Sequence, residues 1–290
     1  MVLTKKLLRR RAARFTGVLA ALALTAGFAA APATADPQPI YIGLGDSYAA
    51  GTGGGAYLPN SFPAPTDCRQ TASAYSTQLH GFNWGCFGYT TEGVSAVVNG
   101  ASLDPASAPY LANASVITVT VGGNDIDTGA VAANCVPSTA TAGCKAALFN
   151  SLAVKLPKLP AKIKAMVALI KQKAPRAKVV LTGYPRLFTV SDLMPAEQKA
   201  AAKTMNSAAD LLNATIALSA LATRTKYVSV TNQFVNHGVG SASPWIVGLQ
   251  PQCQLSATCP PGEQPLDTFH PTATGYTSGY RAAVAAALAP

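Results

Sequence analysis

Residues 40–51 decide the fold; they read IYIGLGDSYAAG and lead from an apolar run into a glycine-rich turn. Short apolar runs such as Ile40–Leu44 are typical of strands that are buried on both faces of a parallel sheet. The carboxyl ends of such strands form a ligand crevice, so Ser47 would lie there with its backbone N–H directed into the same space. The alternative is that Ser47 only caps the next helix.

Further apolar runs follow along the chain, at Phe82–Phe87, Val116–Val121, Lys178–Leu181 and Tyr227–Val230. Helices are expected between them, because residues 155–173 carry an apolar stripe at helical spacing. Pro195 can open a second helix that runs to about Ala222, and a last helix follows Pro271. This alternation, without an intervening linker, predicts a single-domain, three-layer α/β/α fold around a central, mostly parallel sheet.

The N-terminus has the three-part pattern of a secretory signal peptide. Residues 1–14 hold six Lys and Arg residues, an apolar stretch runs from Gly17 to about Ala31, and residues 33–35 (Ala-Thr-Ala) form a small-x-small cleavage site. The apolar stretch is shorter than the ~20 residues that span a bilayer, which argues against a permanent anchor. We therefore expect residues 1–35 to be removed, residues 36–290 to form the mature domain, and the protein to be secreted.

Removal of this segment lowers the net charge, which is +10 for the whole chain. Subtracting its six basic residues from 22 leaves 16 basic against 12 acidic residues, a net charge of +4. A surplus of this size gives little support to nucleic-acid binding. The lysines of residues 155–178 fit either an anionic lipid surface or a solvated helix face, and we favour the solvated face.

Six cysteines occur in the chain, an even number that fits disulfides in an oxidising compartment. The sequence cannot fix their pairing, but joining sequential neighbours is the simplest choice: Cys68–Cys86, Cys135–Cys144 and Cys253–Cys259. The rival interpretation is a zinc site. Because no pair has C-x-x-C spacing and no histidine stands in a ligand-like array, we predict no metal.

Two more segments carry candidate catalytic residues. Val116–Val121 leads into a Gly-Gly-Asn-Asp turn, where the amide of Asn124 could donate to a developing oxyanion. Further on, His270 could act as a general base for a serine, with Asp267 three residues earlier to orient the imidazole. Taken alone, the first is a common turn and the second a capping Asp with an incidental histidine. The occurrence of Ser47, Asn124 and then Asp267 with His270 in one chain makes those alternatives weaker. The other two histidines, His80 and His237, have no acid three residues upstream, so we do not expect them to act as the base.

From about Ile40 to Tyr280, the chain resembles an SGNH hydrolase of the GDSL type, closest to secreted actinomycete lipases and esterases with three disulfides. The resemblance rests on the G-D-S, G-G-N-D and D-x-x-H segments and on Gly88 after the second strand. It implies a flavodoxin-like, five-stranded sheet and no cofactor. It also implies roles for individual residues: Ser47 as nucleophile, His270 as general acid/base, Asp267 as third member, and the N–H groups of Ser47 and Gly88 with the Asn124 side chain as oxyanion hole. Some relatives orient the histidine with a backbone carbonyl instead. We interpret Asp46 and Asp125 as structural.

The implied reaction is hydrolysis of carboxylic esters of lipids, acylglycerols or phospholipids, through an acyl-enzyme. A carbohydrate acetyl esterase, an acyltransferase and a non-catalytic lipid- or glycan-binding protein remain as alternatives. A monomer is expected, with transient contact to a lipid surface and no nucleic-acid partner. We expect three segments without strands to shape the pocket: Tyr57–Pro65, Leu103–Tyr110 and Pro244–Pro265.

Overall fold

Five parallel strands form the central sheet of the computed structural model, which describes residues 39–59, 68–249 and 267–289. The strands are β1 (Ile40–Gly45), β2 (Phe82–Gly85), β3 (Ala114–Thr120), β4 (Lys178–Thr182) and β5 (Lys226–Val228). Their order in the sheet is β2-β1-β3-β4-β5, and all four pairings are parallel. This is the flavodoxin-like order, in which the chain changes direction across the sheet between β1 and β3. The predicted fold class is confirmed.

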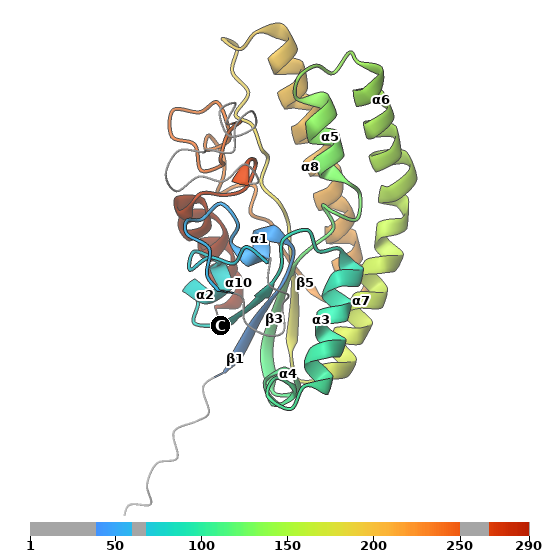
Figure 1. Cartoon of the computed structure of the whole chain (residues 1–290), viewed down its shortest axis with the longest axis vertical. Coiled ribbons are helices and arrows are strands. Elements are labelled where there is room, and N and C mark those ends of the chain that lie inside the picture. The colour runs from blue at the N-terminus through green and yellow to red at the C-terminus, as the bar shows by residue number, and fades with distance from the viewer. Residues whose placement is uncertain (1–38, 60–67, 250–266, 290) are drawn as a thin grey trace, which may run out of the picture. The chain divides into compact units, whose positions relative to one another are not determined.

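Helices cover both faces of the sheet, as Figure 1 shows. One face packs against α3 (Thr91–Leu103), α7 (Leu159–Lys173) and α8 (Ala196–Ala222). The other packs against α2 (Tyr75–Gln78), the π-helix η4 (Gly275–Arg281) and α10 (Ala282–Leu288). The remaining helical segments are α1 (Ser47–Ala50), α4 (Ala108–Ala112), α5 (Thr128–Cys135), α6 (Ala142–Leu148), the π-helix η1 (Phe149–Lys155) and the 3-10 turn η2 (Leu156–Lys158).

The two faces of the sheet have different chemistry. Toward α3 and α7 the strands present large apolar side chains such as Ile42, Leu44 and Ile117, all fully buried. Toward η4 they present threonines, whose hydroxyls are paired: Tyr75 with Thr120 at 2.8 Å and Thr120 with Thr182 at 2.5 Å. Because strand side chains alternate between faces, one run of residues supplies both layers. The pairing satisfies the hydroxyls of Thr120 and Thr182, so these two threonines are buried without unsatisfied groups.

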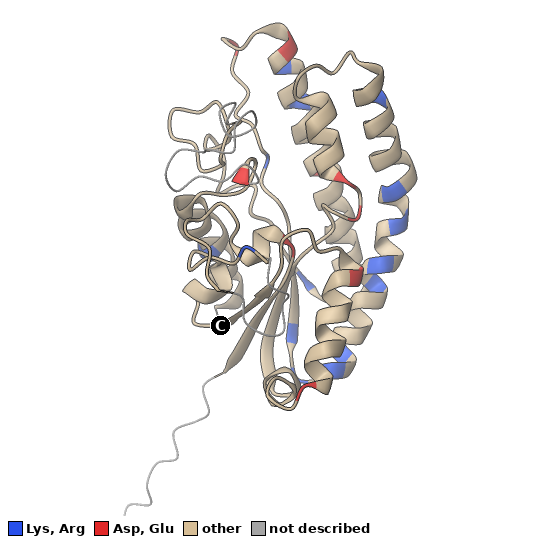
Figure 2. Ribbon diagram, in the orientation of Figure 1, with Lys and Arg blue, Asp and Glu red and all other residues tan. Residues whose placement is uncertain are grey.

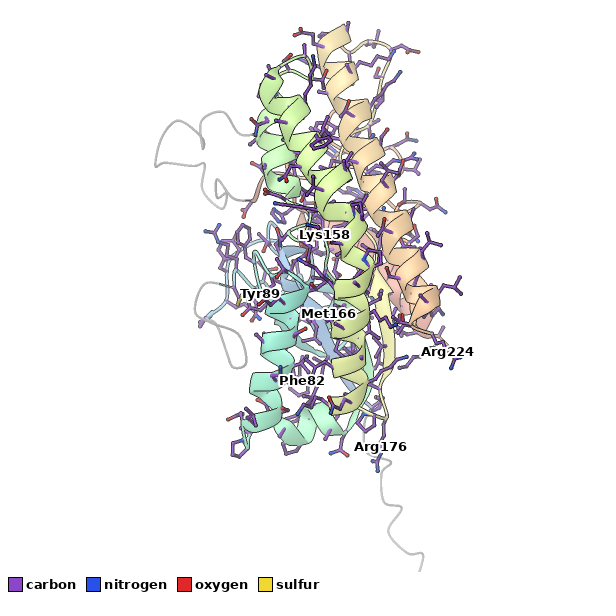
Figure 3. The ribbon with its side chains drawn as sticks, turned by 90° about the vertical axis from the view of Figure 1, so that its right-hand side faces the viewer. Phe82, Tyr89, Lys158, Met166, Arg176 and Arg224 are labelled. Carbon is purple, nitrogen blue, oxygen red and sulfur yellow. A yellow bond between two sulfur atoms is a disulfide. The ribbon has the colours of Figure 1, made fainter. Side chains whose placement is uncertain are left out.

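The helix predicted from Lys155 begins later as an α-helix. Its apolar stripe, from Leu159 to Ile170, is buried as expected. The four residues before it form the end of η1 and then η2, because Pro157 and Pro160 lack the N–H that a regular α-helix needs. The lysines at positions 162, 164 and 171 of α7 are exposed, and Figure 2 shows basic residues along the ribbon of this helix. Figure 3 shows the side chains of this region, with Lys158 near the start of α7.

Two disulfides join sequential neighbours, Cys68 to Cys86 and Cys135 to Cys144. The third predicted pair, Cys253–Cys259, lies outside the described residues, as does the predicted signal peptide at residues 1–35. None of the helices in the described part of the chain is long and apolar enough to cross a membrane.

Gly45 lets the ends of β1 and β3 meet. Its φ is +136°, and a Cβ atom there would lie 2.1 Å from the carbonyl oxygen of Thr120. We expect Gly45→Ala to lower the free energy of unfolding by roughly 3 kcal/mol or more, since it adds both a steric clash and backbone strain. Urea titration measures this loss. Gly100→Ala in α3 is the control: its added methyl group meets nothing within 4 Å, so we expect a gain of up to about 1 kcal/mol. An equal response of the two variants would contradict the role of Gly45.

Candidate active site

Ser47 and His270 are in hydrogen-bond contact, although 223 residues separate them in the sequence. The distance from His270 Nε2 to Ser47 Oγ is 2.7 Å. Ser47 is the first residue of α1, directly after β1, and Asp46 caps this helix by accepting from the N–H of Tyr48 at 3.0 Å. An imidazole at this distance can take the hydroxyl proton, which is the geometry that a serine nucleophile requires.

The other ring nitrogen of His270 faces a backbone carbonyl. His270 Nδ1 lies 3.3 Å from the carbonyl oxygen of Asp267, and the Asp267 carboxylate accepts a hydrogen bond from the Tyr57 hydroxyl. Burial, with a further contribution from this bond, raises the pKa of Tyr57, so its hydroxyl stays protonated and donates. In this arrangement the carbonyl of Asp267 meets the imidazole, while the carboxylate ties the turn to Tyr57.

The three predicted oxyanion donors line the same cavity as His270. Ser47, Gly88 and Asn124 all belong to its wall. Gly88 has a φ of +80°, a conformation that glycine adopts without strain. The side-chain amide of Asn124 donates to the carbonyl of Tyr89 at 2.8 Å. This bond fixes the amide orientation of Asn124 and links the turn after β3 to the turn after β2.

Tyr184 connects two of these turns and was missed as a site residue by the sequence analysis. Its hydroxyl donates to the carboxylate of Asp46 at 2.5 Å and accepts from the N–H of Gly123 at 3.1 Å. The Asn213 side chain of α8 bonds both backbone groups of Tyr184: it accepts from the N–H and donates to the carbonyl, each at 2.8 Å. The sequence showed only a tyrosine shortly after the fourth apolar run, at the end of the sheet where the site was expected. Only the packed sheet shows that this tyrosine reaches Asp46.

Asp46 and Asp125 hold turns in place, in keeping with their interpretation as structural. The Asp125 carboxylate accepts from the N–H and the hydroxyl of Thr91, at 2.9 and 2.8 Å, and from Lys162 at 3.2 Å. Asp46 is buried, and this burial raises its pKa to about 7, although the hydrogen bond from Tyr184 acts in the opposite direction. Ionised Asp46 therefore lowers the free energy of unfolding near neutral pH.

The cavity beside Ser47 has a volume of about 210 Å³, which exceeds the roughly 150 Å³ that accommodates a benzene molecule. We call it the Ser47 pocket. Away from Ser47 and His270, most of its walls are apolar and come from α5, α8 and the segment after β4. The residues concerned are Gly129, Val131, Ala132, Pro185, Leu187, Met205, Ala208, Ala209 and Leu212.

The segments that we expected to shape the pocket do not line it where the structure describes them. Neither Leu103–Tyr110 nor the described parts of the other two segments belong to the lining. The prediction was wrong for Leu103–Tyr110, whereas residues 60–65 and 250–265 of the other two segments lie outside the described residues. In the described part of the chain, α5, α8 and the turns after the strands line the pocket. His237 lies elsewhere: its ring stacks on Trp245 with 3.6 Å between ring centroids, and its Nδ1 lies 2.8 Å from the carbonyl oxygen of Ser243.

Comparison with known proteins identifies the family. Residues 44–277 match the model of the GDSL-like Lipase/Acylhydrolase family. The chain belongs to this family. It is 29% identical over 282 residues to Lipase 1 of Streptomyces coelicolor, an alignment that covers 92% of this chain and 96% of that protein.

Two solved structures are similar to this GDSL-family chain. One is the extracellular lipase from Streptomyces rimosus, with a TM-score of 0.71, 26% identity, and coverage of 86% of this chain and 99% of that one. The other is phospholipase A1 from Streptomyces albidoflavus NA297, with a TM-score of 0.69, 28% identity, and coverage of 86% and 98%. The predicted family and enzyme class are confirmed: this GDSL-family protein is a carboxylic ester hydrolase.

The raised pKa of Asp46 makes stability depend on pH. Unfolding lets this carboxyl ionise near pH 4, whereas in the folded protein it ionises near pH 7. The loss of folding stability caused by Asp46 is therefore absent below pH 4, grows between pH 4 and 7, and is complete above pH 7. We expect Asp46→Asn to gain stability relative to the wild type by up to roughly 4 kcal/mol between pH 4 and 8. Urea titrations of both proteins across this range measure the difference, and a difference independent of pH would contradict the assignment.

Proposed function

We propose that the protein hydrolyses carboxylic esters of lipids through an acyl-enzyme on Ser47. The observation that carries this proposal is the 2.7 Å contact between His270 Nε2 and Ser47 Oγ, at the wall of a mostly apolar cavity that also contains the Asn124 amide. In this proposal Ser47 is the nucleophile and His270 the general acid/base. The carbonyl of Asp267 orients the imidazole, since it lies 3.3 Å from Nδ1.

The reaction proceeds in two halves. His270 Nε2 takes the proton of Ser47 Oγ while that oxygen attacks the ester carbonyl carbon. The oxyanion of the tetrahedral intermediate accepts hydrogen bonds from the N–H groups of Ser47 and Gly88 and from the Asn124 amide. The C–O bond to the alcohol then breaks, and the alcohol leaves with the proton from His270. Water then attacks the acyl carbon while His270 takes a proton from it, the bond to Ser47 Oγ breaks, and His270 returns the proton to that oxygen as the carboxylic acid is released.

The chemistry of the Ser47 pocket supports lipid esters as the substrate class. Its walls from α5 and α8 consist mainly of Gly, Ala, Val, Leu and Met residues, with Thr128 of α5 and Ser151 of η1, and suit an acyl chain. The names of the relatives, two lipases and a phospholipase A1, support lipid esters in general, either acylglycerols or phospholipids. Secretion is part of the proposal, and the N-terminal signal pattern and the extracellular lipase from Streptomyces rimosus support it.

Loss of one oxyanion donor tests the assignment of Asn124. We expect Asn124→Ala to lower kcat by about a hundredfold or more, because removing one such donor typically raises the barrier by roughly 3–4 kcal/mol. Steady-state hydrolysis of a soluble ester measures the effect. Asn134→Ala is the matched control, since Asn134 is an exposed residue of α5 outside the pocket and should leave kcat at the wild-type value. Near-normal turnover of Asn124→Ala would remove this residue from the mechanism.

Labelling and chain-length measurements test the function itself. We expect an organophosphate to modify Ser47 stoichiometrically, and Ser47→Ala to abolish both labelling and hydrolysis, while Ser102→Ala on α3 changes neither. On a series of esters from acetate to hexadecanoate, we expect kcat/KM to rise with chain length as more apolar surface is buried. Modification of a different serine would refute the mechanism. A clear preference for acetate would instead favour an acetyl esterase.

A further inference from the structure

Ser151, whose hydroxyl is buried without a hydrogen-bond partner among the described residues, belongs to the wall of the Ser47 pocket. Ser151 belongs to the π-helix η1, is 1% exposed, and lines the pocket. Within the part of the chain that the structure describes, its Oγ has no hydrogen-bond partner. A buried polar group costs free energy when it stays unpaired, so a buried hydroxyl at a pocket wall calls for a partner.

Two other helical serines of this protein, Ser95 and Ser219, are paired within their own helix. Ser95 Oγ donates to the carbonyl of Thr91 at 2.8 Å, and Ser219 Oγ donates to the carbonyl of Thr215 at 2.7 Å. Both bonds reach the carbonyl four residues earlier, as is usual for serine in a helix. Ser151 makes no such bond. It lies in a π-helical turn, a rare backbone conformation that is found frequently at functional sites.

The surroundings of Ser151 restrict the chemistry of its partner. The pocket wall to which Ser151 belongs also includes Val131 and Ala132 of α5 and Met205 of α8. The ionisable residues of the described lining stand instead at Ser47 or are bonded to its neighbours: Asp46, Tyr48, Tyr184 and His270. Apart from Ser151, the α5 and α8 walls carry one more hydroxyl residue, Thr128, among apolar side chains. A neutral hydroxyl in such a wall suits a neutral oxygen atom, because it can donate to a carbonyl or accept from a hydroxyl.

We propose that Ser151 forms a polar subsite for an oxygen atom on the acyl chain, so that the protein favours esters of oxygenated fatty acids, carrying a hydroxyl or carbonyl group, over unsubstituted chains of equal length. This proposal rests on the proposed function, which puts the acyl chain in this part of the pocket. An unsubstituted chain leaves the hydroxyl unpaired, whereas an oxygenated chain pairs it. The free energy of one neutral hydrogen bond corresponds to a preference of roughly three- to tenfold.

Hydrolysis of matched esters tests the subsite. The substrates are p-nitrophenyl octadecanoate and a set of p-nitrophenyl hydroxyoctadecanoates with the hydroxyl at different positions. We expect the wild type to hydrolyse at least one hydroxylated isomer with a kcat/KM threefold or more above that of the unsubstituted ester. Ser151→Ala is expected to bring this ratio to about one. A wild-type ratio of one for every isomer, or a ratio that persists in Ser151→Ala, would overturn the proposal.

Ser76→Ala is the matched control. The Oγ of Ser76 is also buried and unpartnered within the described residues, but Ser76 lies in α2 against Gly43 and does not line the pocket. Each of the two variants removes a buried, unpaired hydroxyl, so both are expected to fold with a Tm at or above that of the wild type. Ser76→Ala should keep the wild-type ratio. Loss of the ratio in both variants would overturn the assignment to Ser151.

A binding measurement separates failure of the subsite from failure of the proposed function. Hydroxyoctadecanoic and octadecanoic acids are compared as competitors of a fluorescent fatty acid on the wild type and on Ser151→Ala. If no ester is hydrolysed, the proposed function fails, and the ratio of the two binding constants still tests Ser151. If esters are hydrolysed but the hydroxylated acids and esters gain nothing over the unsubstituted ones, only the subsite is overturned.

Discussion

The close approach of the ends of β1 and β3 is the constraint on which the rest of the site depends. The N–H of Asp46 donates to the carbonyl of Thr120 at 2.8 Å, and Gly45 leaves no side chain between the two strands. This contact brings the serine turn beside the Gly-Gly-Asn turn at the position where the strand order changes direction. Parallel α/β sheets bind ligands at this position, because the connections on either side diverge and leave a crevice.

Buried hydrogen bonds hold the three turns in a fixed arrangement. Tyr184 joins the turns that follow β1 and β3, and the Tyr48 hydroxyl donates to the carbonyl of Phe269 beside His270 at 2.5 Å. Such a network preorganises catalytic groups because each side chain is held by a neighbour that is itself packed. Burial raises the pKa of Asp46, which belongs to this network. The network therefore lowers the stability of the folded protein near neutral pH while it positions the catalytic groups.

The helices α5, η1 and α8 line much of the pocket, and the lysines before and within α7 pair with aspartates after β3. Segments α5, η1 and α8 supply the pocket wall, and the lysine-rich stretch before and within α7 contacts the turn after β3. Lys155 pairs with Asp127 at 3.1 Å, and Lys162 with Asp125 at 3.2 Å. The basic run is therefore more than a solvated face: two of its lysines hold the loop that carries Asn124. Of the other lysines of α7, Lys164 and Lys171 are exposed and Lys173 is half-buried.

The sequence by itself determined the strands, the α/β class and the three short segments with Ser47, Asn124 and His270. These features are encoded locally, by hydrophobic periodicity and by residue types at fixed spacing, so no distant contact is needed to recognise them. Only the tertiary structure decided that the carbonyl of Asp267 faces His270, that Tyr184 reaches Asp46 across 138 residues, and that α5, η1 and α8 wall the pocket. Contacts between residues so far apart in the chain depend on how the whole sheet and its helices pack, and no local pattern records that packing.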